Sequence, residues 1–131
     1  MTLPRAVATF TNETYEEESY DDREGTVLGR VHITRRFSGD LEGTSTAELL
    51  TARTEDGSAA YVALDHVEGR LGGRAGSFVL SHYGTVSSAG AETAGSVVPG
   101  SGTRELSGLR GDASISVDED GTHALTMEYE L

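Results

Sequence analysis

The chain contains no cysteine and no lysine, and these two absences exclude several kinds of chemistry. Without Cys there is no thiolate nucleophile, redox dithiol, disulfide or Cys-ligated zinc site. Without Lys there is no Schiff base and no Walker-type phosphate lysine, since all ten basic residues are Arg. Any catalysis by this chain must therefore use His, Asp, Glu, Tyr, Ser, Thr, Arg or backbone NH groups.

Long apolar runs and positive charge are also scarce. No run approaches the roughly 18 apolar residues of a membrane-spanning helix, and the first residues, "MTLPRAVATF", lack the apolar segment of a signal peptide. Twenty-two acidic residues against ten basic ones give a net charge of -12, which repels nucleic-acid phosphates and anionic lipids. We therefore expect a cytoplasmic protein without nucleic-acid or membrane partners, folded as one domain over residues 1–131.

Short segments of alternating apolar and polar residues, separated by Gly, Asp and Ser clusters, run along the chain from Arg5. Such alternation is typical of antiparallel strands, and nothing indicates a long helix. Strong turn signals stand at 55–58 and at Asp120-Gly121. The predicted strands are 5–16, 26–37, 43–54, 58–71, 75–86, 93–99, 113–117 and 122–131.

Eight such strands, each with one apolar face and no helix to cover it, bury those faces most simply by closing on themselves. The sequence therefore predicts an all-β fold, an eight-stranded antiparallel closed barrel with little or no helix. An open sandwich is the alternative.

An acidic run, "EEESYDDRE", covers residues 16–24. No spacing within it matches a calcium-binding loop, so we interpret it as a solvated loop or sheet edge.

The segment "VPGSGTRELSGLRG", residues 98–111, is rich in glycine but matches neither phosphate-binding pattern. The third glycine of a dinucleotide fingerprint is replaced by Glu105, and Leu109 stands where a Walker motif needs Lys. We predict instead a structural corner, in which Pro99 ends a strand, glycines take positive φ, and Leu106 and Leu109 plug one end of the barrel.

Three segments, taken in order, resemble the bacterial DUF3224 family, whose function is unknown: "FSGDLEG" (37–43), "AAYVALDHVEGRLGGRAGSFVLSHYG" (59–84) and "VPGSGTRELSGLRGDASI" (98–115). The resemblance covers nearly the whole chain and implies a barrel of the allene oxide cyclase-like type. The chain departs from the family pattern at Tyr15, where the family tends to have Trp, and at Asp65-His66, where it tends to have Glu-Arg. Because the family has no assigned activity, it supplies no functional residues.

Polar residues that alternate with apolar ones are the candidates for an interior site. His82 shares a face with Phe78 and Leu80, and Arg35 lies between Ile33 and Phe37. Glu48 and Asp65 are the plausible inward carboxylates, and which face of the strands 43–54 and 58–71 points inward is left open by the alternation. An inward carboxylate beside His82 or Arg35 can shift pKa values toward neutrality and allow proton transfer. The alternative without function is that such groups are buried and form hydrogen bonds with backbone carbonyls. The candidate catalytic residues are His82, Glu48, Arg35 and Asp65, and the candidate ligand-binding residues are Tyr61, Tyr129, Phe78 and Met127.

Three functional hypotheses remain open. The first is a cofactor-independent isomerase or cyclase acting on an apolar small molecule inside the barrel, and the second is a barrel that only binds such a molecule. The third is a barrel filled by its own side chains that acts through its surface, with homo-oligomer formation expected. No cofactor is expected and no metal site, because the four histidines lie on separate predicted strands without ligand spacing.

Overall fold

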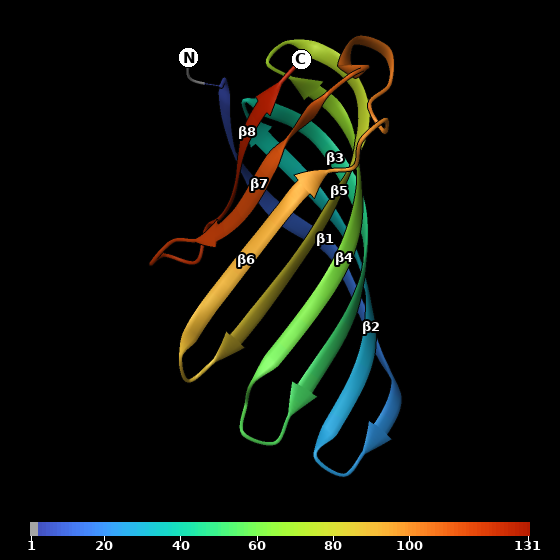
Figure 1. Ribbon diagram of the computed structural model, residues 1–131, viewed down its shortest axis with the longest axis vertical. Helices are drawn as coiled ribbons and strands as arrows, with labels where there is room; N and C mark the ends of the chain where they lie inside the picture. The colour runs from blue at the N-terminus through green and yellow to red at the C-terminus, as the bar shows by residue number, and fades with distance from the viewer. Residues whose placement is uncertain (1–2) are drawn as a thin grey trace.

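The computed structural model describes residues 3–131, and these form one closed antiparallel barrel in which the strands pair in sequence order (Figure 1). The prediction of an eight-stranded barrel is confirmed. Within the described residues the helical structure is a three-residue 3-10 turn, η1 (Arg104–Leu106), and no helix is long and apolar enough to cross a membrane. The strands are β1 (Arg5–Arg23), β2 (Thr26–Gly39), β3 (Leu41–Thr54), β4 (Ala59–Leu71), β5 (Arg74–Ser87), β6 (Gly90–Val97), β7 (Arg110–Val117) and β8 (His123–Glu130).

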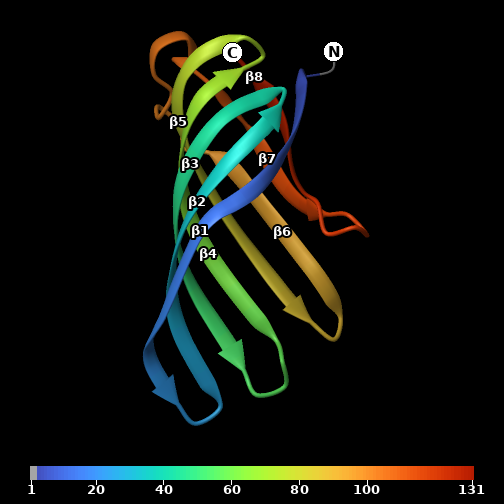
Figure 2. The ribbon, with the colours of Figure 1, turned by 180° about the vertical axis from the view of Figure 1, so that it is seen from behind.

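Unequal strand lengths divide the barrel into two halves. β1 to β5 have 13 to 19 residues, whereas β6, β7 and β8 have eight each. β8 pairs with β1 only over Arg5–Phe10, and β6 pairs with β7 at two positions, Gly95 and Ser96. Beyond these pairings the hairpins β1–β2, β3–β4 and β5–β6 continue as a curved sheet, seen from both sides in Figures 1 and 2. We call this part the open half and the remainder the closed half.

Apolar side chains fill the closed half, and the glycine-rich corner seals its end. Leu106 and Leu109 are 0% and 1% exposed, and Gly100 and Gly108 have φ of +81° and +86°. The corner is tied to β5, because the Thr103 amide donates to the Ser77 carbonyl at 2.9 Å. The prediction of a structural corner is confirmed. The core of this half consists of Ala6, Ala8, Phe10, Phe37, Leu41, Val67, Leu71, Phe78, Leu80, Val97, Leu106, Leu109, Ala113, Leu125 and Met127.

The acidic run is part of a strand. β1 continues to Arg23 instead of ending at Glu16, with register shifts between Asn12 and Thr14 and between Ser19 and Asp21. Over this stretch β1 pairs with β2 alone, because β8 has already ended. The run is therefore a sheet edge, one of its two interpretations, and its charge lies in solvent where it discourages edge-to-edge pairing.

Candidate functional site

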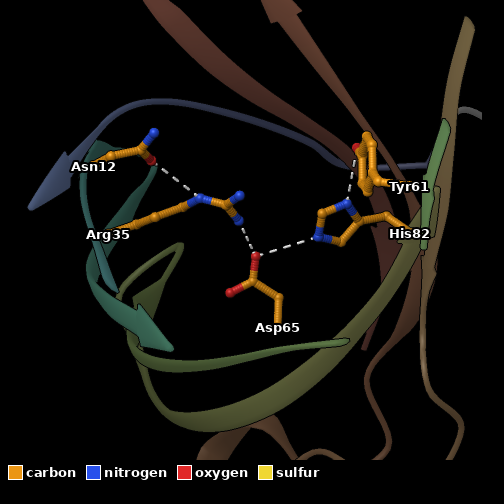
Figure 3. A network of polar contacts seen from close by, with 5 residues as sticks. All are labelled: Asn12, Arg35, Tyr61, Asp65 and His82. Atoms are coloured by element: carbon orange, nitrogen blue, oxygen red, sulfur yellow. Dashed lines mark hydrogen bonds and ion pairs between the residues drawn. The ribbon is translucent and has the colours of Figure 1, made fainter. Parts of the chain in front are cut away.

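Five polar side chains from four strands meet inside the barrel (Figure 3). Arg35 on β2, Tyr61 and Asp65 on β4, and His82 on β5 occupy alternate positions, so their side chains project from the inner face. Asn12 on β1 is the cross-strand neighbour of Arg35. Arg35, Asp65 and His82 are 6%, 2% and 7% exposed. We call these five residues the polar network.

The network is a continuous chain of contacts centred on one carboxylate oxygen. Arg35 Nη1 forms an ion pair with Asp65 Oδ2, and His82 Nε2 lies 3.3 Å from the same oxygen. His82 Nδ1 lies 3.1 Å from the Tyr61 hydroxyl, and the two rings meet edge to face with centroids 5.5 Å apart. At the other end Arg35 Nε donates to Asn12 Oδ1 at 3.3 Å. Each member is thus oriented by the next.

The contacts assign donor and acceptor roles within the network. An ionised Asp65 only accepts hydrogen bonds, so His82 Nε2 carries a proton and donates it. In the neutral imidazole Nδ1 is then an acceptor, and the Tyr61 hydroxyl donates to it. Burial raises the pKa of Asp65, but the hydrogen bond from His82 and the charge of Arg35 outweigh it, so the pKa is lowered overall. Burial raises the pKa of Tyr61. At neutral pH the network therefore holds a carboxylate and a protonated phenol.

The lowered pKa of Asp65 predicts a pH dependence of stability. A carboxylate with a depressed pKa stabilises the fold fully above its unfolded-chain value, 3.8, and loses that contribution as the pH falls through its lower folded-state pKa. We expect the stability difference between wild type and Asp65→Asn to be largest above pH 3.8 and to shrink below it. Urea unfolding followed by circular dichroism between pH 7 and pH 3 measures this difference; a gap that is constant with pH would show that Asp65 gains nothing from ionisation.

The surroundings of the network are apolar on one side and more open on the other. The Arg35 guanidinium lies 5.3 Å from the centre of the Phe10 ring, at the border of the closed-half core. Tyr61 packs against a second buried cluster, formed by Val31, Ile33, Ala47, Leu49 and Ala63. Among the described residues no hydrogen-bond partner reaches two buried polar atoms, Asp65 Oδ1 and Ser45 Oγ. The network thus runs from the core at Arg35 to the half-buried ring of Tyr61, which borders the open half.

The free space near the network is unevenly distributed. A cavity beside Tyr61 and His82, bordered by Thr93 and Ile115 along the seam between β6 and β7, has a volume of about 10 Å³, which is room for about one water molecule. A hollow of about 280 Å³ lies in the open half, and Thr51, the cross-strand neighbour of Tyr61, is among its lining residues. Glu17 and Arg53 also line this hollow, and Tyr61 itself does not. A substrate-sized ligand therefore fits in the open half beside Thr51, and not in the cavity that Tyr61 and His82 border.

The structure brings together four of the eight predicted site residues: Arg35, Asp65, His82 and Tyr61. Glu48, one of the two carboxylates considered for the interior, lies outside the barrel and takes no part in the network. Its carboxylate lies on the outer face and is 2.6 Å from His32 Nδ1, because Ala47 and Leu49 take the inner positions of β3.

The other three predicted residues lie away from the network. Phe78 and Met127 are each 1% exposed within the closed-half core, and Tyr129 packs against that core, with its hydroxyl near Gly72. Asn12 was not among the predicted site residues, because it lies next to a register shift where simple alternation along β1 fails.

The site has no metal-binding constellation. Among residues 3–131 no three His, Asp or Glu side chains are grouped as potential ligands. Three of the four histidines, His32, His66 and His123, take no part in the network, and they lie on β2, β4 and β8.

Comparisons with known proteins agree with the fold. Residues 6–129 match the family model described as "Protein of unknown function (DUF3224)". A crystal structure of a DUF3224 protein of unknown function from Shewanella oneidensis MR-1 is similar, with 34% sequence identity, a TM-score of 0.83 and 98% of each chain covered. No curated protein matches the sequence. Since the family model spans nearly all of the chain, the protein belongs to the DUF3224 family.

Proposed function

We propose that the protein binds a small, mostly apolar molecule in the open half of the barrel and catalyses a proton shift on it without a cofactor. The observation that carries the proposal is the oriented chain from the Asp65 carboxylate through His82 to the Tyr61 hydroxyl. A buried carboxylate that holds an imidazole in one tautomer, with a hydroxyl on the other ring nitrogen, is the arrangement by which enzymes activate a hydroxyl group.

The proposed step is a proton relay. The Tyr61 oxygen accepts a proton from an acidic C–H of the substrate while the phenol proton moves to His82 Nδ1. The resulting imidazolium is stabilised by the Asp65 carboxylate, whose ionisation Arg35 maintains. Return of the proton by the same path to another substrate atom completes an isomerisation, and Tyr61 and His82 recover their starting states.

Exchange of carbon-bound protons tests this relay. The probe is 2-tetralone, an apolar ketone with acidic α-protons, whose exchange in D₂O is followed by ¹H NMR. We expect the wild-type protein to accelerate exchange, and Tyr61→Phe and His82→Asn to slow the protein-dependent rate by about a hundredfold, within the range of general acid–base catalysis.

The matched control is His66→Asn, because His66 is exposed on the same strand as Tyr61 and outside the network. This variant should exchange protons at the wild-type rate. Wild-type exchange no faster than that in buffer, or equal rates in wild type and His82→Asn, would contradict the relay.

The second candidate function is ligand binding without chemistry. The cavity at His82 favours it, because a volume of about 10 Å³ leaves no room for a substrate beside the imidazole. Amide chemical shifts measured with 2-tetralone separate the two. Shifts at Thr51 and Gly84, next to Tyr61, without accelerated exchange would select a binding protein.

A further inference from the structure

The outer surface of β3, β4 and β5 carries four large apolar side chains. Leu50, Val62, Leu64 and Tyr83 are 46%, 56%, 58% and 52% exposed. Leu50 pairs with Val62, and Val62 pairs with Tyr83, so these three form one row across the sheet. Leu64 lies two residues from Val62 in the next row. We call these four residues the outer patch. They border an open hollow of about 670 Å³.

The outer patch is separate from the barrel core. The inner positions of the same strands are occupied by Leu49, Ala63 and His82, which are buried. The outer side chains therefore have no packing role within one chain. Apolar groups gathered on one exposed face of a protein mark an interaction surface. We therefore expect this face to bind a partner.

We propose that the partner is a second copy of this chain, packed sheet against sheet through the outer patch. Two groups of opposite charge stand at the β2 side of the patch. Arg30 is the cross-strand neighbour of Leu50, and Glu48 is that of Leu64. Within residues 3–131 Arg30 has no ion-pair partner. Glu48 holds His32 through one carboxylate oxygen at 2.6 Å, and its side chain is 58% exposed, so its other oxygen is open to a cation. A face that presents an unpaired cation and such a carboxylate is complementary to itself.

A two-fold axis across the strands satisfies both the apolar and the charged groups. With the axis between the row of Val62 and the row of Leu64, Val62 of one copy faces Leu64 of the other. The same operation places Arg30 opposite His32 of the second copy, one strand from Glu48, so the long Arg30 side chain can reach the Glu48–His32 pair. Each contact occurs twice, as an isologous interface requires.

The size of the face and its charge fit this arrangement. β2 to β5 have 13 or 14 residues each, and four strands of that length present a face of roughly 800 Å². Nearly this whole face, with the outer patch at its centre, supplies the ~800 Å² that each partner contributes to a standard interface. The net charge of -12 opposes contact between copies elsewhere, and the outer patch is where apolar side chains replace that charge.

Sedimentation equilibrium measures the mass of the protein in solution and so tests whether it dimerises. One chain has a mass of 13.8 kDa, and we expect wild-type protein at about 100 μM, well above the micromolar range of weak complexes, to show twice that mass. Leu64→Asp places an unpaired charge at the centre of the interface and should give the single-chain mass. The control Val117→Asp introduces the same charge at an equally exposed valine, 59% exposed, outside the patch, and should leave the dimer intact.

An exchange of the two charges tests the contact between Arg30 and Glu48 directly. Recovery of the dimer in the double variant also shows that the single variants did not simply fail to fold. Arg30→Glu and Glu48→Arg should each weaken the dimer at least tenfold, and the double variant should restore it. Strand-type circular dichroism of every variant verifies the fold. A single-chain mass for wild type would overturn the proposal and leave the patch to a different partner. A dimer that persists in Leu64→Asp, or a double variant that dimerises no more tightly than the single ones, would also overturn it.

Discussion

Asp65→Ala is expected to lower the free energy of unfolding by about 3–5 kcal/mol, the typical cost of removing one partner from a buried ion pair. Arg35 is 6% exposed and its charge faces Asp65, so the guanidinium would remain in the interior without its counter-ion. His82 would also lose the acceptor of its Nε2 proton. The loss is measured by urea unfolding at pH 7.

The control replaces both charges at once. Arg35→Met with Asp65→Leu leaves no unpaired charge inside the barrel, and buried ion pairs replaced by apolar residues of similar size often retain stability. We expect the double variant to unfold at higher urea concentration than Asp65→Ala. If Asp65→Ala costs less than about 1 kcal/mol, the range of exposed ion pairs, Arg35 is solvated and not buried.

Leu106→Ala is expected to destabilise the protein by about 2–5 kcal/mol, because truncating a buried leucine removes apolar contacts and leaves a cavity. Leu106 is 0% exposed and belongs to the plug of the closed half. Its surroundings have little freedom to collapse. A Cβ added at Gly102 would lie 1.9 Å from the Leu106 carbonyl oxygen, and one added at Gly76 would lie 3.2 Å from its side chain.

Thermal and urea unfolding measure this cost. The control is Leu131→Ala, because Leu131 is 45% exposed and follows the last strand. That variant should lie within about 0.5 kcal/mol of wild type, as surface substitutions usually do. A loss of similar size in both variants would mean that the corner does not seal the barrel.

Alternation predicted the barrel well because most strands have one apolar face. The eighth strand is clearest, since Leu125 and Met127 are buried and Thr126 and Glu128 are not. The same alternation predicted a strand that is too short where β1 leaves the closed half, ending it at Glu16 instead of Arg23. β1 continues through its acidic run because pairing with β2 alone sustains a strand, and no local pattern of charge reveals that partner.

The inward direction of β3 and β4 could not be predicted, and the outer patch is the physical reason. Leu49 and Leu50 are adjacent, so either can belong to the core, and on β4 both alternating sets contain apolar residues. Two of the five residues of the polar network, Arg35 and His82, followed from the apolar residues that flank them in the sequence. Asp65 was one of two possible carboxylates, and the structure separates it from Glu48.

The pairing of β1 with β8 governs how this chain reaches its native topology. Every other pairing joins strands that are consecutive in sequence, whereas Phe10 meets His123, 113 positions later. Because closing a long loop costs chain entropy before any contact rewards it, we expect this pairing to form after the hairpins. Arg35, Asp65 and His82 lie on β2, β4 and β5, so a sheet of consecutive hairpins already places them together, and closure then seals an ion pair that has already formed.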